Sequence, residues 1–581
     1  MRWALAVLVV GWAAGQARGA PVELVEEAPA RVVAIGPNSI QLDFGRVAFG
    51  NLLIAPPAGC SGPLTVRFGE ACVGGRIDRA PRGSVRYAEV KVDSVGGTAQ
   101  VVAPAANVRN TTQPQAVLTP GKWGVVLPFR WVEIDGWRGG RPGAAIRRRA
   151  AYSSSWSDGA AAFRSSDDML NRIWDLCHYS IKATSFAGVF VDGDRERTAY
   201  EADAYLNQLG YFAGDPDPSI PRATFERLLR LPTWPTEWAP HLVFIAHDDW
   251  MQTGDSAWLA VHYKFLWSKL LIERAGPDGL ITSTPQQIAR GDLVDWPAEE
   301  RDGFVFCRVN TVVNAFYLRA LEQMADLARA LGRSADAREL ESRREAALAA
   351  FQRRLFDPVK GLYRDGDGTD HVSLHANLFP LAFGLVAEER RPRIARWLAE
   401  RGMACSVYGA QYLLEALFEN DESAAAVALM TAPGDRSWRH MVESGTTITW
   451  EAWDQRYKPN QDWTHAWGAA PANLLPRFVL GVMPRTPGWS SVEIRPEFGG
   501  LTMCSGIVPT PRGPIRIRWQ RAERLRLELQ LPEGVAAHIV LPANQVSGAV
   551  RVDGRVADVV KSGNARALVQ PVMGHCVVEV P

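Results

Sequence analysis

The chain has 581 residues, more than one hydrophobic core normally supports, so we expect about two to four domains. Hydrophobic residues make up 47% and charged residues 22% of it, which is typical of a globular protein and excludes a disordered or fibrous one. The formal net charge is +1, so the charge balance does not indicate a nucleic-acid partner or a membrane surface.

The N-terminus has the pattern of an export signal. Arg2 supplies a positive charge, residues 3–14 are almost entirely apolar, and the small residues that follow suit cleavage near Ala17 or Ala20. The apolar run is shorter than the ~20 residues that span a membrane. We therefore expect a signal peptide over residues 1–20, an exported protein (periplasmic or extracellular), and no membrane insertion after signal cleavage.

Residues 21–150 have the pattern of a β-domain. The runs at 31–35, 64–68 and 87–92 alternate or are rich in valine, and clusters of Gly, Pro and Asn separate them. This pattern predicts a β-sandwich. A linker rich in Ser, Ala and Gly follows over residues 151–162.

From Ser166, a candidate helix cap, the hydrophobic period changes from two to 3.6. Helical segments are predicted at 166–185, 200–213, 222–231, 240–253, 256–275, 308–331, 335–355, 373–384, 387–401, 408–419, 422–432 and 463–480. Twelve helices in one domain, residues 160–485, fit an (α/α)6 toroid of six helical hairpins. An irregular α-solenoid would show a repeat of fixed period, and we find none. In a toroid, the loops at one end of the inner helices converge on a cup, where a site is expected.

Residues 486–581 return to β character. The runs 492–495, 515–519 and 525–529 alternate cleanly, which predicts a second sandwich packed on the toroid. The seven cysteines are scattered and show no spacing typical of zinc, so we expect no metal and no cofactor; Cys60 and Cys72 are close enough in sequence to pair.

A charged stretch from Asp192 to Tyr205 holds five carboxylates and two arginines within fourteen residues, between apolar flanks. Charges beside apolar walls are costly unless they pair or take part in chemistry. A salt-bridge network at the start of a helix is one interpretation. A second cluster, Glu443 to Asp454 followed by His465, favours a catalytic one.

Cleavage of a glycosidic bond needs two carboxyl groups, one protonated and one ionised, about 6.5–9.5 Å apart in an inverting enzyme. Glu196 and Glu451 are our candidates for this pair. Nearby carboxylates such as Asp192 and Asp203 favour a protonated Glu196 by like-charge repulsion. The arginines on either side of Glu196 oppose this, and the sequence leaves the balance open.

Other loops between the predicted helices combine aromatic and acidic residues. Trp234 and Glu237 share one loop, and Asp295 and Trp296 share another. Each is more often structural than functional when taken alone. Together they are what a sugar cup requires, since indoles stack on ring faces and carboxylates bind hydroxyls.

The two clusters resemble the motifs of the six-hairpin α-L-rhamnosidases, glycoside hydrolase family 78. Asp192-Gly193-Asp194-Arg195-Glu196-Arg197, with Tyr200 and Asp203 after it, resembles the acid-bearing motif of that family. Gly445-Thr446-Thr447-Ile448-Thr449-Trp450-Glu451-Ala452-Trp453-Asp454 resembles its base motif, and His465-Ala466-Trp467-Gly468-Ala469 resembles the segment that follows.

The resemblance implies that Glu196 is the general acid and Glu451 the general base. It implies that Asp192 and Asp203 bind sugar hydroxyls, and that Arg195, Trp296 and His465 line the cup. The further residues that we expect to bind the sugar come from the same motifs and loops: Tyr200, Trp234, Glu237, Asp295, Trp450 and Trp453. The first motif is one residue shorter between Asp192 and Glu196 than the family pattern, and Glu201 stands where a small residue is usual. These departures predict a different aglycone or a related sugar.

We therefore expect an exported inverting glycoside hydrolase with a carbohydrate substrate. It would remove terminal α-L-rhamnosyl residues, or those of a closely related sugar, from oligosaccharides, polysaccharides or glycosides. The alternatives are a polysaccharide lyase on a similar toroid, which would use a Tyr or His base, and a non-catalytic carbohydrate-binding protein.

Overall fold

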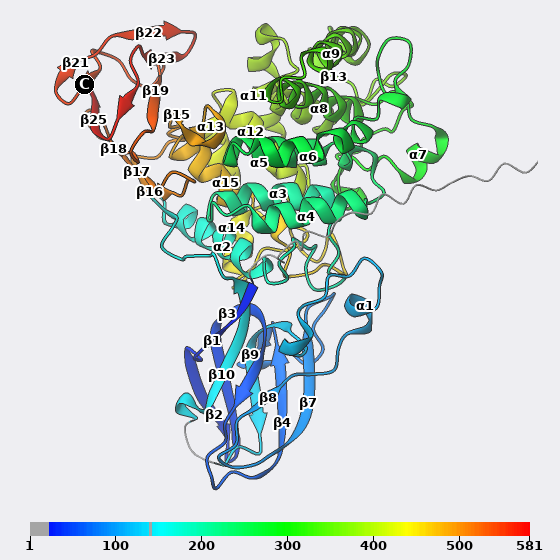
Figure 1. The fold of residues 1–581 in the computed structure, drawn as a ribbon, viewed down its shortest axis with the longest axis vertical. Helices are drawn as coiled ribbons and strands as arrows, with labels where there is room; N and C mark the ends of the chain where they lie inside the picture. Colours follow the sequence, from blue (N-terminus) through cyan, green and yellow to red (C-terminus); the bar gives the residue numbers. More distant parts are fainter. Residues whose placement is uncertain (1–21, 139–141) are drawn as a thin grey trace, which may run out of the picture.

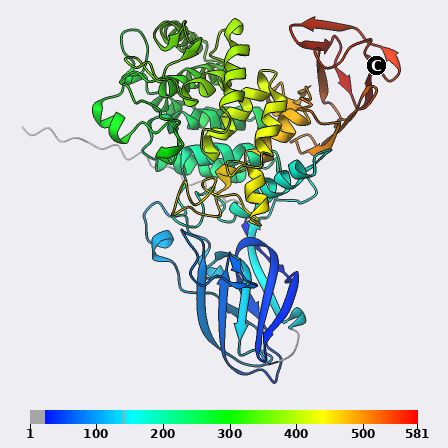
Figure 2. The same cartoon turned by 180° about the vertical axis from the view of Figure 1, so that it is seen from behind.

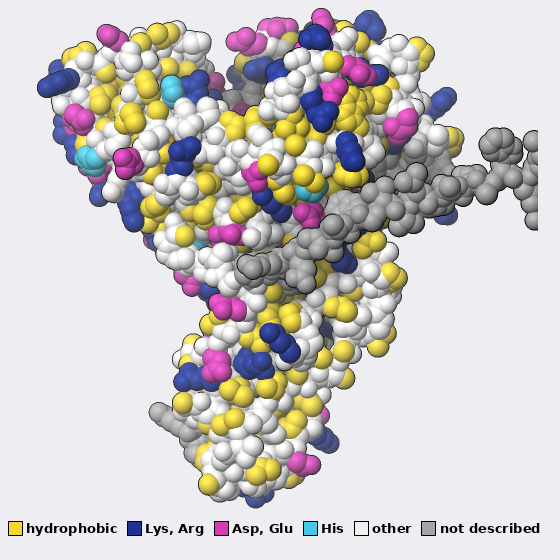
Figure 3. Space-filling model, viewed as in Figure 1, with side chains coloured by type: hydrophobic (Ala, Val, Ile, Leu, Met, Phe, Trp, Pro, Cys, Tyr) yellow, Lys and Arg dark blue, Asp and Glu magenta, His cyan; other side chains and the backbone are white. Residues whose placement is uncertain are grey.

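The computed structural model describes residues 22–138 and 142–581, so the predicted signal peptide lies outside the described residues. A helical body joins two sheet-rich bodies, one formed by the N-terminal part of the chain and one by the C-terminal part (Figures 1 and 2). Lys and Arg side chains are interspersed with Asp and Glu over the face shown in Figure 3. In the described ranges, no helix is both long and apolar enough to cross a membrane.

The N-terminal body is built on β3 (Ser39–Ile54), the longest strand of an eight-stranded sheet. The order is β1-β10-β3-β9-β4-β7, and β2 and β8 also pair with β3. A register shift between Asp43 and Ala48 bends the sheet around a core that includes Phe44, Phe68 and Phe129. The other strands are β1 (Val22–Glu27), β2 (Arg31–Gly36), β4 (Gly62–Gly69), β7 (Tyr87–Ser94), β8 (Gln100–Val102), β9 (Leu127–Asp135) and β10 (Ile146–Ser153).

An inner ring of six buried helical segments forms the centre of the helical body. Each contacts the next, and the last contacts the first, so the ring closes. Its members are α3 (Glu201–Phe212), α5 (His241–Thr253), α8 (Thr311–Ala330), α10 (His375–Ala382), α12 (Val407–Glu419) and α15 (Pro471–Leu474), which a π-helix extends to Val479.

Six outer helices cover this ring, and each contacts the inner helix that comes before it around the ring. They are α2 (Asp168–Thr184), α4 (Ser219–Arg230), α6 (Ser256–Leu266), α9 (Ser334–Leu355), α11 (Arg391–Arg401) and α13 (Ser423–Met430). The predicted (α/α)6 toroid is confirmed, with one of the twelve helices in each predicted segment.

Local details differ from the prediction. The N-cap of α2 is Asp167, whose carboxylate accepts a hydrogen bond from the backbone N–H of Leu170 at 2.9 Å. The Ser166 hydroxyl instead accepts one from the N–H of Thr502, in the C-terminal body. Three short helices were not predicted: α1 (Val108–Thr111), α7 (Pro285–Arg290) and α14 (Trp438–Glu443).

The C-terminal body contains a seven-stranded sheet and a six-stranded sheet. The larger sheet begins with β11 (Ala162–Ser165), which directly follows the linker and pairs with β16 (Met503–Val508). The predicted alternating runs lie in β15 (Ser491–Ile494), β17 (Ile515–Arg521) and β18 (Leu525–Gln530). All seven cysteines are free, so Cys60 and Cys72 do not pair.

Gly506 allows β11 to lie close to β16. A Cβ at this position would meet the carbonyl oxygen of Ala162 and the side chain of Leu480. Gly506→Ala is therefore expected to lower the free energy of unfolding by about 1–3 kcal/mol, measured by denaturant and thermal unfolding. Gly159→Ala is the matched control, since a Cβ there meets nothing within 4 Å. Equal stability of the two variants would contradict the prediction.

Candidate active site

The N-terminal ends of the inner helices point to the same end of the toroid, because each inner helix follows an outer one around the ring. The loops that enter α3 and α15 contain the two charged clusters of the sequence. Pairing between Arg195 and Glu451, and between His465 and Asp203, shows that these loops meet. The partial positive charge of helix N-termini favours carboxylates at such an end.

Arg195 joins the two candidate catalytic carboxylates. Its Nη1 and Nη2 donate to Oε2 and Oε1 of Glu451 at 2.6 and 2.8 Å, a bidentate ion pair. Its Nε lies 3.5 Å from Oε1 of Glu196. Two side chains 255 positions apart in the sequence therefore meet at one guanidinium.

Glu451 is the more enclosed of the two, with 2% of its side chain exposed. Its Oε2 also accepts a hydrogen bond from the backbone N–H of Asp462 at 3.0 Å, and Nζ of Lys458 lies 3.4 Å from Oε1. Burial by itself raises the pKa of Glu451, but His465, Arg195 and Lys458 outweigh it and hold the pKa below its usual value. Glu451 is therefore held ionised.

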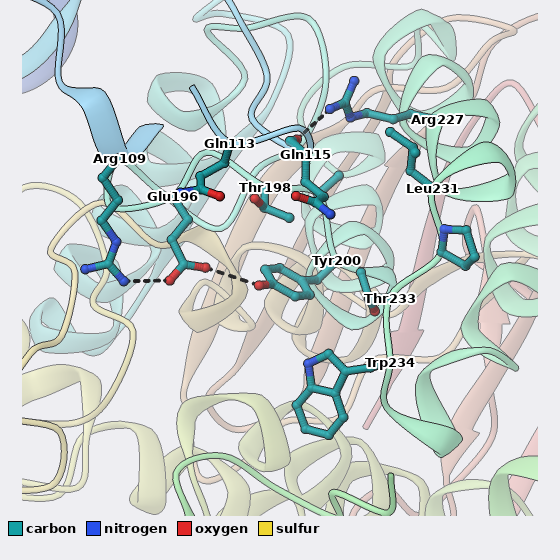
Figure 4. Close-up of a pocket in the computed structure, with 12 residues that line it drawn as sticks. Arg109, Gln113, Gln115, Glu196, Thr198, Tyr200, Arg227, Leu231, Thr233 and Trp234 are labelled. Atoms are coloured by element: carbon teal, nitrogen blue, oxygen red, sulfur yellow. Dashed lines mark hydrogen bonds and ion pairs between the residues drawn. The ribbon is translucent and has the colours of Figure 1, made fainter. Parts of the chain in front are cut away.

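Glu196 is 29% exposed and faces a cavity. Its Oε1 pairs with Nη2 of Arg109 at 2.8 Å, and its Oε2 accepts a hydrogen bond from the Tyr200 hydroxyl at 3.1 Å (Figure 4). Burial raises the pKa of Glu196, whereas Arg195, Arg109 and Tyr200 lower it, and the net pKa is below its usual value. The balance that the sequence left open thus favours the ionised form in the free protein.

Asp192 and Asp203 are buried. Oδ1 of Asp192 accepts a hydrogen bond from the backbone N–H of Thr198 at 2.8 Å. Burial first, and then the negative charges of Glu196 and Asp203, raise the pKa of Asp192 well above its usual value. Asp203 pairs with Nε2 of His465 at 2.6 Å.

Three predicted sugar ligands lie inside the protein, each 0% exposed: Glu237, Asp295 and Trp453. The Glu237 carboxylate accepts a hydrogen bond from the backbone N–H of Leu293 at 2.8 Å, and burial raises its pKa to about 7. Asp295 pairs with Nε2 of His375 at 2.7 Å. The Trp453 indole donates to a backbone carbonyl. Because their polar groups are bonded within the protein, these three side chains support the loops of the cup instead of lining it.

The predicted aromatic residues differ in exposure. Trp234 is 56% exposed and lines the cavity beside Tyr200. Trp296 is half-buried, with the Lys458 ammonium 5.0 Å from the centre of its ring. Trp450 is buried and stacks on Trp463. Trp234 is therefore the most open stacking surface among the predicted tryptophans.

The cavity that Glu196 faces has a volume of about 540 Å³. One side comes from the N-terminal body, through Arg109, Gln113 and Gln115, and the other from α4 and the loop after it (Figure 4). Glu451 is not among the residues that line it. Arg109 was not predicted as a site residue, because no motif links it to a loop 87 positions away.

Asp194 holds the N-terminal body against the loop that carries Glu196. Its carboxylate is 1% exposed and pairs with Arg86 of the N-terminal body and with Nη2 of Arg197 at 2.6 Å. The amide of Asn110, in α1 (Val108–Thr111), donates to its backbone carbonyl at 2.6 Å. Arg197 also donates to the carbonyl of Val126, in the N-terminal body, at 2.7 Å. In the described residues, no group of three or more His, Cys, Asp or Glu side chains is arranged to hold a metal ion.

The chain matches two family models. The bacterial α-L-rhamnosidase six-hairpin glycosidase domain matches residues 158–213 and 218–479, and the bacterial α-L-rhamnosidase C-terminal domain matches residues 481–555. An α-L-rhamnosidase of Alteromonas sp. (strain LOR) is 23% identical over 458 residues, 72% of this chain and 48% of that protein. The chain thus spans about half the length of this relative.

Solved structures share the fold. The α-L-rhamnosidase from Dictyoglumus thermophilum superimposes with a TM-score of 0.78 at 16% identity, over 96% of this chain and 64% of that one. The Streptomyces avermitilis α-L-rhamnosidase complexed with L-rhamnose superimposes with a TM-score of 0.77 at 17% identity, over 97% of this chain and 54% of that one. At these identities the likeness concerns the fold alone.

Asp194→Asn is expected to destabilise the whole protein, because it leaves two arginines with a neutral partner. Removing one partner of a buried ion pair costs about 3–5 kcal/mol in the free energy of unfolding, measured by denaturant titration. Asp158→Asn is the control, since Asp158 is exposed and pairs with Lys182 at the surface, where such a pair contributes about 1 kcal/mol or less. A loss no larger than that of the control would contradict the role of Asp194.

The free energy of unfolding of Asp192→Asn is expected to increase relative to that of the parent as the pH rises. A carboxyl whose pKa is raised by folding contributes stability that is full below its unfolded pKa, near 3.8, and is lost as the pH approaches the folded pKa. An asparagine does not titrate, so the free energy of unfolding of the variant should gain on the parent from about pH 4 to neutral. Asp370→Asn, at an exposed position, is the control for the loss of one carboxylate. A constant difference for Asp192→Asn across this range would contradict the raised pKa.

Proposed function

Because the chain belongs to the bacterial α-L-rhamnosidase family of six-hairpin glycosidases, we propose that it hydrolyses terminal α-L-rhamnosyl residues, or those of a closely related sugar, with inversion at the anomeric carbon. The observation that carries this proposal is the meeting of Glu196 and Glu451 at Arg195. Hydrolysis of a glycosidic bond requires two carboxyl groups at one site. We also propose, from residues 1–20, that the protein is exported.

In this proposal the different surroundings of the two glutamates assign their roles. Glu451 is enclosed and held ionised by Arg195 and Lys458, as a general base must be. Glu196 faces the cavity, so it can reach the oxygen of a leaving group there. Arg195 is a positioning residue that fixes the two carboxylates relative to each other.

Glu196 can act as the acid only when it carries a proton. In the free protein, Arg195, Arg109 and the Tyr200 hydroxyl hold its pKa below the usual value. A bound substrate has to raise this pKa, either by excluding water around the carboxyl or by drawing Arg109 away. Arg109 is suited to such a movement, because it is exposed and comes from a separate body of the protein.

Glu451→Gln and Glu196→Gln are expected to differ in how strongly their effect on the rate depends on the leaving group. Loss of the base should reduce kcat by about 10²–10⁴-fold on both a nitrophenyl and a methyl α-L-rhamnoside, because both need an activated water. Loss of the acid should affect the methyl glycoside much more, because nitrophenolate leaves without a proton. Kinetics on the two substrates and NMR of the first-released anomer, expected to be β, test the proposal.

Glu443→Gln is the matched control, since Glu443 is exposed and pairs with Arg439 at 2.7 Å. It should behave as the parent does. Near-parental turnover of the methyl glycoside by either site variant, or release of the α-anomer first, would contradict the proposed mechanism.

A further inference from the structure

The cavity beside Glu196 lies where a leaving group would be, and the inference drawn from it rests on the proposed function. An acid that protonates the glycosidic oxygen must contact the leaving side of the bond. Among the residues that line this cavity, Glu196 is the one carboxylate. The part of the cavity away from Glu196 would therefore hold the aglycone.

The lining carries two guanidinium groups, those of Arg109 and Arg227. Arg109 pairs with Glu196, whereas no described carboxylate lies within ion-pair distance of Arg227. Nη2 of Arg227 donates to the carbonyl of Gln115 at 2.5 Å, and this contact spans from α4 to the N-terminal body (Figure 4). A guanidinium has five N–H donors in a planar fork, so most of those on Arg227 remain for a ligand.

Neutral groups suited to a sugar surround this charge. Trp234 offers an exposed indole face, and the amides of Gln113 and Gln115 and the hydroxyls of Thr198 and Thr233 can bind ring hydroxyls. A cavity of about 540 Å³ is within the range for small-molecule sites.

Glu201 fixes one wall of this cavity. Its Oε1 accepts a hydrogen bond from the backbone N–H of Thr233 at 2.9 Å, and its Oε2 accepts one from the Thr233 hydroxyl. These contacts hold the loop that presents Trp234. Burial raises the pKa of Glu201. The Glu201 carboxyl therefore ionises less readily than an exposed one. It also does not line the cavity, so it offsets little of the positive charge there.

We propose that this cavity is a leaving-group subsite for an acidic sugar, in which Arg227 binds the carboxylate of a uronate. A carboxylate matches the planar fork of a guanidinium in shape as well as in charge. Its negative charge would also help Glu196 to hold a proton, both directly and by competing for Arg109. Binding of the acidic leaving group in this subsite would thus also favour the protonated form of Glu196.

The test compares an α-L-rhamnosyl-glucuronate oligosaccharide with its carboxyl-reduced neutral counterpart, which has the same linkage. The parent should show a kcat/KM at least about tenfold higher for the acidic substrate, as expected for a hydrogen-bonded charge. Arg227→Gln should bring the ratio of the two kcat/KM values close to one, and Arg227→Lys should keep part of the preference.

Arg230→Gln is the matched control, because it removes the same charge from the same helix at a residue that does not line the cavity. It should keep the parental ratio. As a second readout, free glucuronic acid should inhibit the parent more strongly than glucose does, and Arg227→Gln should lose this difference. Thermal unfolding confirms that the variants are folded.

The outcomes separate the two proposals. If the parent cleaves nitrophenyl α-L-rhamnoside but shows no preference for the acidic substrate, or if Arg227→Gln keeps the preference, the acidic subsite is wrong and the proposed function stands. If the parent cleaves none of these rhamnosides, the proposed function fails, and the subsite that rests on it fails too.

Discussion

The carboxylate of Asp194 is the constraint on which the arrangement of the site depends. A charge that is 1% exposed must be paired, and its partners are Arg86 and Arg197. Since Arg86 belongs to the N-terminal body, satisfying this one buried charge fixes that body against the toroid. The two residues that follow Asp194, Arg195 and Glu196, are then presented to the loops of the toroid.

The same short segment therefore has two tasks. Asp194 and Arg197 contact the N-terminal body, and Arg195 and Glu196 contact Glu451 and the cavity. This division explains why so many charges occur together in the sequence. The salt-bridge and catalytic interpretations of the cluster are therefore compatible. Most of its charges form a salt-bridge network, and Glu196 faces the cavity.

The helices and the main strands could be predicted, because a hydrophobic period of 3.6 or two is a local property of the sequence. The motifs also predicted that the loops of Glu196 and Glu451 meet. Exposure could not be predicted: the sequence shows a carboxylate or an indole but not the bonds it makes, so Glu237, Asp295 and Trp453 were placed on the cup although they lie behind it. Long-range pairing, as of β11 with β16, left no local pattern either.

Arg109 and Glu201 shape the cavity beside Glu196. Neither bridges the two catalytic candidates as Arg195 does, yet Arg109 pairs with Glu196, and Glu201 holds the loop of Trp234. Both act on the cavity, and neither contacts Glu451 in the described structure. The pairing around Arg195 and Glu451 and the lining of the cavity are thus set by different residues. Since the cavity is lined by both the N-terminal body and the toroid, a change in either one is enough to alter it.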